Sequence, residues 1–350
     1  MEYRSLGRSG LRVSAFSFGA MTFGGTGGFA AVGDTKAAGA KRLVDMCLDA
    51  GVNLFDTADV YSQGKSEELL GKALGTRRPR VHIATKFMAR TGPGVNDEGA
   101  SRHHIIDACN ASLRRLGTDY IDLYQIHNQD LSVPPEEVSR AFDDLVRAGK
   151  VRYIGSSNHS GWTKMRALAI SDRLGHARYI SQQIQYSLLR REAEDELLPL
   201  GVNEGVGALI WGPLASGYLS GKFRRKNDGA HTRLRDGGRL PAVDTERARA
   251  IVQAVEKVAK GRKGVSAAQV ALNWVVRKAS VSSIILGARN AAQLVDNLAA
   301  SAWSLSDSEI AELDQASALP PRYPYDMHHN FMGHRNMRAP LLPPVDTGIS

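Results

Sequence analysis

The sequence has few cysteines and no long apolar run. Two cysteines, Cys47 and Cys109, are too few for a disulfide framework. Both fall on apolar stripes with helical spacing, so we expect buried free thiols, as in a cytoplasmic protein. No stretch approaches the ~18 consecutive apolar residues of a membrane-spanning helix. The first residues lack the basic-then-apolar pattern of a secretory signal. These absences predict a chain that does not bind or cross a membrane and needs no disulfide bonds.

Acidic residues are scarcer than basic ones. The chain has 45 Lys and Arg against 36 Asp and Glu, a net charge of +9. Such an excess favours anionic partners, which include nucleic acids and phosphate-bearing small molecules. Because the sequence has no zinc-finger spacing, basic helix or aromatic-interleaved basic strand, we expect no nucleic-acid binding. A ligand with phosphate groups explains part of the excess more simply.

Short apolar strands alternate with helical patterns along most of the chain. A predicted hairpin at 3–13 is followed by strands at 15–18, 52–56, 81–85, 120–126, 151–154, 179–186, 206–211 and 283–286. Strict alternation predicts parallel strands, and unbroken apolar runs suit strands covered on both faces. We therefore predict a single α/β domain over 1–318, a (β/α)8 TIM barrel, rather than an open doubly wound sheet.

Helix ends follow from capping residues and glycines. Asp34 or Thr35 can cap a helix that runs to Gly51, and Ser101 can cap one that stops at Gly117. Further helices are predicted from 66 to 75 and from 134 to 149. Another follows Asn158 and runs to about 174, and the last ones are predicted at 192–200, 244–260, 266–278, 291–300 and 306–316.

The final segment, 319–350, is rich in proline. It holds six of the 13 prolines, which excludes a long helix. We predict that residues 320–335 form a lid over the barrel mouth, with a partly disordered arm as the alternative. His328, His329 and His334 are interpreted as solvated or stacking side chains, and no metal site is expected.

Four polar side chains fall at the carboxyl ends of neighbouring predicted strands. Asp56, Lys86 and His127 end the second, third and fourth strands, and Tyr61 follows on the loop after Asp56. Since neighbouring strands lie ~4.8 Å apart, these groups are expected to converge within roughly 10 Å. They would meet at the rim where barrel enzymes have their active sites.

This set of side chains suits proton transfer to a carbonyl oxygen. A phenol has a pKa of about 10 and is a weak acid. A lysine ammonium ~4 Å away, at an effective dielectric of ~20, favours the phenolate by ~4 kcal/mol, whereas burial opposes ionisation. Asp56 would keep Lys86 charged, and a neutral His127 would orient the carbonyl. No side chain supplies hydride, so a nicotinamide cofactor is required. Each residue alone has an ordinary structural explanation, but their coincidence favours catalysis.

The segments around these residues resemble hallmark segments of the aldo-keto reductase family. They are Asn53-Leu-Phe-Asp-Thr-Ala-Asp-Val-Tyr61, Ala84-Thr-Lys86, Tyr120-Ile-Asp-Leu-Tyr-Gln-Ile-His127 and Val151-Arg-Tyr-Ile-Gly-Ser-Ser-Asn158. The resemblance extends from residue 3 to about residue 298. It implies a barrel that binds NADPH without a Rossmann domain. It also implies that Tyr61 is the general acid/base, that Asp56 and Lys86 assist it, and that His127 positions the substrate.

The same resemblance implies residues that hold the nicotinamide. Ser157, Asn158 and Gln183 match residues that bind its carboxamide, and Trp211 matches the aromatic platform beneath the ring. Gly212 stands where the family usually has a serine, so one hydroxyl contact is absent. Leu214 and Lys222 match positions along the cofactor. Both lie in a basic segment, 212–243. Its arginines can neutralise a pyrophosphate: Arg224, Arg225, Arg233, Arg235 and Arg239.

A phosphate site is expected after the eighth strand. Gly287 and Arg289 precede a helix N-terminus, which together with an arginine is a natural anion site. With Gln293 and Asn297 they resemble the family's site for the adenosine 2′-phosphate, so NADPH/NADP+ is the expected cofactor. The Lys-Ser pair that members often carry near Gly287 is missing and Asp296 replaces a commoner glutamate, so NADH stays possible.

Two other interpretations stay open. Gly25-Thr-Gly-Gly-Phe-Ala30 fits a G-x-G-x-x-A dinucleotide motif with Asp56 as the ribose-binding acid, but no helix opens until about Thr35. Some family relatives are regulatory subunits of ion channels that sense the redox state of nicotinamide and turn over poorly. The sequence favours NADPH-dependent reduction of small-molecule aldehydes or ketones to alcohols, reversible in principle. A homo-oligomer is possible.

Overall fold

The computed structural model describes residues 1–221, 245–320 and 322–327, and these residues build a closed barrel of parallel strands. The strand order around the barrel is β10-β3-β4-β5-β6-β7-β8-β9, so consecutive strands are neighbours and the last pairs with the first. The strands are β3 (Phe16–Gly19), β4 (Leu54–Asp56), β5 (His82–Phe87), β6 (Ile121–Ile126), β7 (Val151–Ser157), β8 (Tyr179–Gln185), β9 (Gly207–Trp211) and β10 (Val281–Leu286). The predicted (β/α)8 barrel is confirmed.

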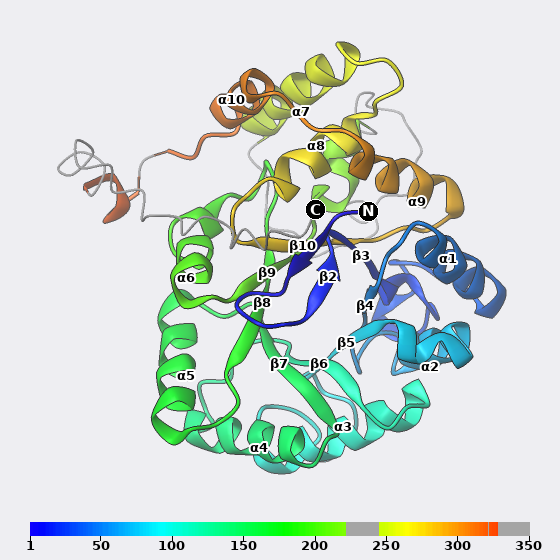
Figure 1. Cartoon of the computed structure of the whole chain (residues 1–350), viewed down its shortest axis with the longest axis vertical. Coiled ribbons are helices and arrows are strands. Elements are labelled where there is room, and N and C mark those ends of the chain that lie inside the picture. Colours follow the sequence, from blue (N-terminus) through cyan, green and yellow to red (C-terminus); the bar gives the residue numbers. More distant parts are fainter. Residues whose placement is uncertain (222–244, 321, 328–350) are drawn as a thin grey trace.

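Helices surround the strands on the outside of the barrel (Figure 1). The α-helices of the described residues are α1 (Ala37–Asp49), α2 (Lys65–Leu74), α3 (Arg102–Leu116), α4 (Pro135–Arg147), α5 (Gly161–Leu174), α6 (Leu197–Glu204), α7 (Thr245–Lys260), α8 (Ala267–Val276), α9 (Ala291–Leu298) and α10 (Asp307–Ala316). Short 3-10 helices are η1 (Ala20–Thr22), η2 (Gly27–Phe29), η3 (Gly75–Arg80), η4 (Glu192–Glu194), η5 (Ala215–Ser220) and η6 (Ala299–Ala302). No helix in these described parts has the length and apolarity that a bilayer crossing needs.

Capping residues fix several helix ends as expected. The Ser101 side chain accepts a hydrogen bond from the His104 N–H at the start of α3, and Gly117 ends that helix with a left-handed φ of 64°. Ser306 and Glu309 form a reciprocal capping box at the start of α10. These ends depend on local chemistry, which explains why the sequence predicts them.

The start of α1 differs from the prediction. Its N-cap is Lys36, with no side-chain hydrogen bond, and not Asp34 or Thr35. Thr35 instead forms a β-bridge with Phe23, and its N–H donates to the Thr22 carbonyl at 3.0 Å. The glycine-rich loop after β3 therefore holds Thr35 in an extended conformation, and the helix begins later.

The predicted helix at 192–200 is also different. The chain forms the short η4 and then α6, which continues to Glu204 and ends at Gly205 with a φ of 67°. Gly205 provides the left-handed conformation that stops the helix.

An N-terminal hairpin closes one end of the barrel. β1 (Tyr3–Ser5) and β2 (Arg12–Ser14) pair antiparallel, and the hairpin lies across the strands in Figure 1. Buried Leu6 and Leu11 pack with apolar residues of five barrel strands. The strand residues in this cluster are Leu54, Ala84, Leu123, Leu209 and Ile285. The hairpin side of the barrel interior is therefore filled with apolar side chains.

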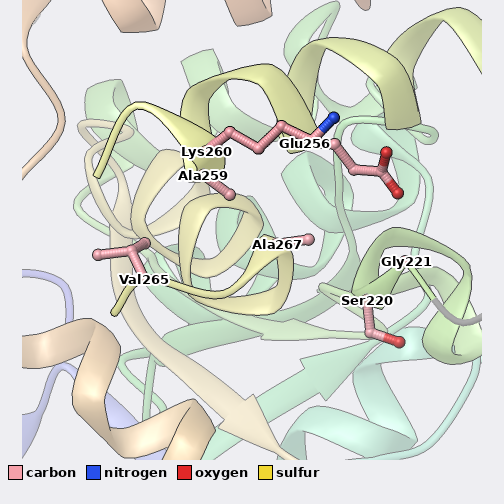
Figure 2. A pocket seen from close by; sticks show the side chains of 7 residues that line it. All are labelled: Ser220, Gly221, Glu256, Ala259, Lys260, Val265 and Ala267. Atoms are coloured by element: carbon pink, nitrogen blue, oxygen red, sulfur yellow. The ribbon is translucent and has the colours of Figure 1, made fainter. Parts of the chain in front are cut away.

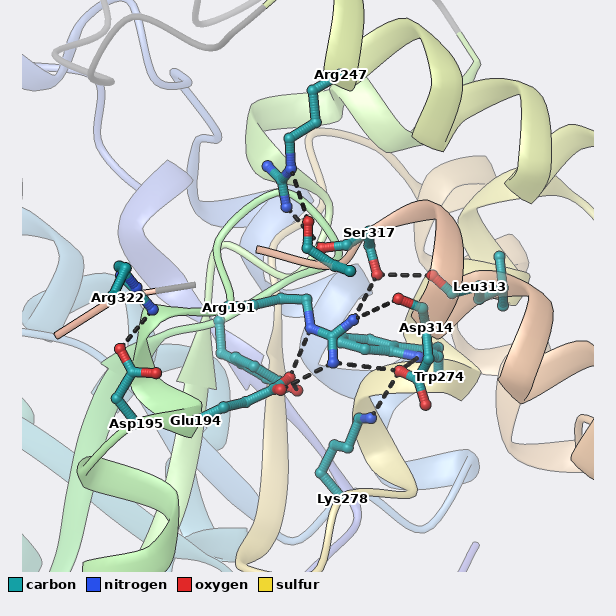
Figure 3. Close-up of polar contacts among 12 residues, drawn as sticks. Arg191, Glu194, Asp195, Arg247, Trp274, Lys278, Leu313, Asp314, Ser317 and Arg322 are labelled. Carbon is teal, nitrogen blue, oxygen red and sulfur yellow. Dashed lines mark hydrogen bonds and ion pairs between the residues drawn. The ribbon is translucent and has the colours of Figure 1, made fainter. Parts of the chain in front are cut away.

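Arg191 anchors helix α10 to the connection after β8 (Figure 3). Its guanidinium donates to both carboxylate oxygens of Glu194 at 2.8 Å, to the Asp314 carbonyl at 2.9 Å and to the Ser317 hydroxyl at 2.8 Å. The Asp314 carboxylate accepts hydrogen bonds from Trp274 at 3.0 Å and Lys278 at 3.1 Å. These contacts fix the end of the helical ring before the tail begins.

The first part of the tail lies against the residues before α6. Arg322 forms an ion pair with Asp195, and the Tyr325 hydroxyl donates to Glu196 at 2.6 Å. Residues 321 and 328–350, with His328, His329 and His334, lie outside the described residues. The lid and the division at residue 318 stay predictions.

Candidate active site

The barrel interior changes from apolar to polar toward the carboxyl ends of the strands. Alternate residues of a strand face the same side, so Asp56, Lys86 and Gln125 share the inward face of Leu54, Ala84 and Leu123. Lys86 pairs in register with Gln125. The period of two thus places a polar layer directly above the apolar layer next to the hairpin.

Lys86 is the centre of the polar layer. Its side chain is 0% exposed, and its ammonium donates to the Asp56 carboxylate at 2.6 Å and to the Thr57 carbonyl at 2.8 Å. A longer contact of 3.4 Å joins it to the Tyr61 hydroxyl. The predicted convergence of these three side chains is thus present in the fold.

Burial and the nearest charge act in opposite directions on the pKa of Lys86 and on that of Tyr61. Burial alone would lower the pKa of Lys86, but the Asp56 carboxylate and Tyr61 outweigh it, so the pKa is raised and the amine stays charged. Burial raises the pKa of Tyr61, and the Lys86 ammonium offsets only part of this rise. Tyr61 is therefore a protonated phenol next to a cation, which is a group suited to donating a proton.

His127 lies beside Tyr61 at the same rim. Their rings meet edge to face, with centroids 5.7 Å apart. Burial, and then the charge of Lys86, lowers the pKa of His127 to about 3. The imidazole is thus neutral at physiological pH, and a neutral ring has one N–H to donate and one nitrogen to accept.

The second Asp56 oxygen accepts hydrogen bonds from two glutamines. The distances are 2.8 Å from the Gln183 amide and 3.4 Å from the Gln125 amide. Gln183 was expected at the nicotinamide carboxamide, and its amide nitrogen also holds the carboxylate that binds Lys86. Sequence reasoning missed Gln125, although a single glutamine in the apolar run of β6 was a usable signal.

The expected carboxamide residues form one connected group at the carboxyl ends of β7, β8 and β9. Asn158 has a left-handed φ of 55°, and its amide nitrogen donates to the His127 carbonyl at 3.0 Å. Its amide oxygen accepts from the half-buried Trp211 indole at 3.1 Å. The Ser157 hydroxyl donates to the Gln183 carbonyl at 3.1 Å. These bonds link the predicted nicotinamide residues to the Tyr61 rim.

The predicted phosphate residues gather after β10. Asn290 caps α9 through the Gln293 N–H, while the Gln293 side-chain oxygen accepts from the Arg289 N–H at 3.0 Å. Gly287 is exposed and Asn297 is buried. The Arg289 guanidinium donates to the Val32 and Ala31 carbonyls at 3.1 and 3.0 Å.

The region after β9 is described only in part. Leu214 precedes η5 and is partly buried against the core. Lys222 and the arginines at 224, 225, 233, 235 and 239 lie outside the described residues. A pocket of about 300 Å³ lies between η5, α7 and α8 (Figure 2). The residues that line this pocket are Ser220, Gly221, Glu256, Ala259, Lys260, Val265 and Ala267. None of them is a predicted site residue.

A second buried acid, Asp59, lies on the loop that follows Asp56. Burial, reinforced by the Glu67 carboxylate, raises the pKa of Asp59 to about 8, against the charge of Arg115. The Arg115 guanidinium and the Thr85 hydroxyl donate to the Glu67 carboxylate, each at 2.6 Å, and not to Asp59. Asp59 therefore keeps its proton at neutral pH.

This proton makes stability depend on pH. The unfolded chain releases it near pH 4, whereas the folded protein holds it to about pH 8. The contribution to stability is complete below the unfolded pKa and is lost as pH rises, by about 1.4 kcal/mol per pH unit in this window. We expect Asp59→Asn to remove this pH dependence, so that the stability of the variant relative to the wild type increases between about pH 5 and pH 8. Urea unfolding at several pH values measures this. The exposed Asp107→Asn is the control, and parallel curves for Asp59→Asn and wild type would contradict the assignment.

The chain is similar to several known proteins. The family model described as "Aldo/keto reductase family" matches residues 15–318. A probable voltage-gated potassium channel subunit beta of Arabidopsis thaliana is 39% identical over 311 residues, covering 86% of this chain and 91% of that protein. The uncharacterized oxidoreductase YrpG of Bacillus subtilis is 39% identical over 324 residues, covering 89% and 94%. Versiconal hemiacetal acetate reductase of Aspergillus parasiticus is 35% identical over 342 residues, covering 90% and 96%.

Proposed function

The chain belongs to the aldo/keto reductase family, and from this premise we propose that it is an oxidoreductase that reduces aldehydes or ketones with NADPH. The observation that carries the proposal is the contact of Lys86 with both Asp56 and Tyr61 at the carboxyl ends of the strands. Relatives named as an oxidoreductase and a reductase support the reaction class.

The residues at the rim fit a nicotinamide. The half-buried Trp211 offers an aromatic face, and Asn158 and Ser157 offer amide and hydroxyl groups for a carboxamide. When bound, a reduced nicotinamide supplies the hydride that no side chain can provide. The carbonyl carbon takes that hydride with its electron pair, and the carbonyl oxygen takes a proton, which gives an alcohol.

Tyr61 gives the proton to the carbonyl oxygen. Its raised pKa keeps it protonated before the reaction, and Lys86, held by Asp56, stabilises the phenolate that forms. Neutral His127 orients the oxygen by a hydrogen bond. Because the resting phenol is protonated, Tyr61 starts in the form that carbonyl reduction needs.

A carbonyl and sugar panel, assayed in both directions with each cofactor, tests the proposal. We expect NADPH absorbance to fall with at least one class of aldehyde or ketone. Tight cofactor binding without turnover across the panel would instead favour a regulatory subunit that senses nicotinamide. That second function is supported by the Arabidopsis thaliana relative, which is a probable voltage-gated potassium channel subunit beta.

The choice between NADPH and NADH is proposed to depend on Arg289. Arg289 directly precedes Asn290, the N-cap residue of α9, and the N-terminal end of a helix favours an anion. We expect Arg289→Ala to weaken NADPH binding by about 10-fold to 100-fold and to leave NADH nearly unaffected, since a hydrogen bond to a charged group contributes ~1.5–3 kcal/mol. Titrations of both cofactors measure the ratio, and the exposed Arg277→Ala at the end of α8 is the control. An unaltered ratio would move the phosphate site elsewhere.

A further inference from the structure

The glycine-rich loop after β3 connects two parts of the candidate site. On one side, the Thr26 hydroxyl donates to the Ser62 carbonyl at 2.8 Å, and the Gly25 N–H donates to the Ser62 hydroxyl at 3.1 Å. Ser62 directly follows Tyr61, and its φ is 50°, a left-handed value that fixes the turn there. The loop is thus attached to the segment that carries the proposed proton donor.

Arg289 holds the other side of the loop. Its guanidinium donates to the carbonyls of Ala31 and Val32, which come two and three residues after the end of η2. The Thr22 hydroxyl adds a bond to the Ala288 carbonyl at 3.2 Å. The loop therefore spans from the Tyr61 rim to the end of β10, with Phe29 of η2 between its two attachments.

Phe29 places an aromatic ring on the proposed proton donor. Its ring centroid lies 5.3 Å from that of Tyr61 at an interplanar angle of 60°, and the side chain is only half-buried. His127 contacts Tyr61 edge to face. Two partly exposed rings thus flank the phenol, and one of them, Phe29, comes from a loop rather than from the barrel.

We propose that Phe29 contacts the substrate and selects carbonyl compounds with a flat, apolar or aromatic substituent, and that Arg289 positions its loop. This rests on the proposed function, because the contact matters only if a carbonyl carbon reacts beside Tyr61. A flat apolar substituent can pack on Phe29 with the offset or edge-on geometry that aromatic pairs prefer. A small aliphatic or polyhydroxy substituent gains little from that ring.

The first arm of the test replaces Phe29. We expect Phe29→Ala to lower the ratio of kcat/KM for benzaldehyde to that for propanal by about tenfold, mainly through a higher KM for benzaldehyde, because the lost packing is specific to the aromatic ring. Tyr3→Ala, which removes an aromatic ring from the hairpin, should leave the ratio unchanged. An unchanged ratio in a folded Phe29→Ala variant would overturn the proposal.

The second arm tests the positioning role of Arg289 with NADH, which has no 2′-phosphate. With NADH, a shift in the benzaldehyde-to-propanal ratio in Arg289→Ala reports the loop and not the phosphate. We expect a loss of about threefold to tenfold in this ratio, and we expect the double variant Arg289→Ala/Phe29→Ala to lose no more than Phe29→Ala alone, because the two changes act through one contact. Additive losses, or a ratio like that of Arg277→Ala, would overturn the role of Arg289.

The two levels of the proposal fail in different ways. If the wild type reduces neither aldehyde while binding cofactor, the proposed function fails and the Phe29 assignment fails with it. If the wild type reduces both aldehydes and Phe29→Ala keeps the wild-type ratio, only the Phe29 assignment fails. Melting temperatures of all variants separate a loss of fold from a loss of selectivity.

Discussion

Replacing Tyr61 with phenylalanine is expected to reduce carbonyl turnover by about 10²-fold to 10⁴-fold, the range that a positioned general acid contributes. The substitution removes only the hydroxyl that lies 3.4 Å from the Lys86 ammonium. The ring contacts with Phe29 and His127 keep their apolar shape. The loss should therefore appear in kcat, with little change in cofactor affinity.

Steady-state kinetics and a cofactor titration measure the two quantities separately. Tyr3→Phe is a matched control, because it removes a tyrosine hydroxyl that donates to the Gly51 carbonyl on the hairpin side of the barrel. Turnover of Tyr61→Phe within a few-fold of the wild type would refute the acid role. A parallel loss of cofactor binding would mean that the hydroxyl has a structural task.

Replacing Lys86 with methionine is expected to destabilise the protein by about 3–5 kcal/mol and to abolish most turnover, because it leaves a buried carboxylate without its cation. Asp56 is 3% exposed, and its partner ammonium lies 2.6 Å away. The amide of Gln183 stays close at 2.8 Å, but a neutral donor replaces only part of the lost interaction.

A double variant separates stability from chemistry. Adding Asp56→Asn to Lys86→Met removes the unpaired charge, so we expect most of the lost stability to return while turnover stays low. Lys65→Met is the control, because its exposed pair with Glu68 is expected to contribute only ~0–1 kcal/mol. Denaturant unfolding measures the stability of each variant, and steady-state kinetics measure its turnover. If the double variant is as unstable as Lys86→Met, the buried pair is not the source of the loss.

Local sequence patterns predicted the barrel because each β/α unit carries its own signals. Apolar runs, Ser101 and Gly117 act within a few residues of the structure that they determine. The start of α1 was missed because Thr35 is bound by the loop after β3, a contact that helix-capping rules do not contain. Prediction therefore succeeded mainly where the determinant was local, although the local stop of α6 at Gly205 was missed.

The same distinction holds for the candidate site. Asp56, Lys86 and His127 could be brought together from sequence because parallel strands bring their carboxyl ends to one rim. The bonds from Arg289 to Val32 join residues 257 positions apart, and the contact of Phe29 with Tyr61 depends on the path of an irregular loop. Neither has a pattern in the chain, and only the fold reveals them. The catalytic and cofactor roles themselves stay proposals.

The apolar hairpin has a consequence for the order in which ligands bind. Leu6 and Leu11 fill the interior at one end of the barrel, so two molecules that meet at Tyr61 must enter and leave through the opposite opening. Under the proposed function, the cofactor and the carbonyl compound would share this opening, so a bound carbonyl compound could obstruct exchange of the cofactor.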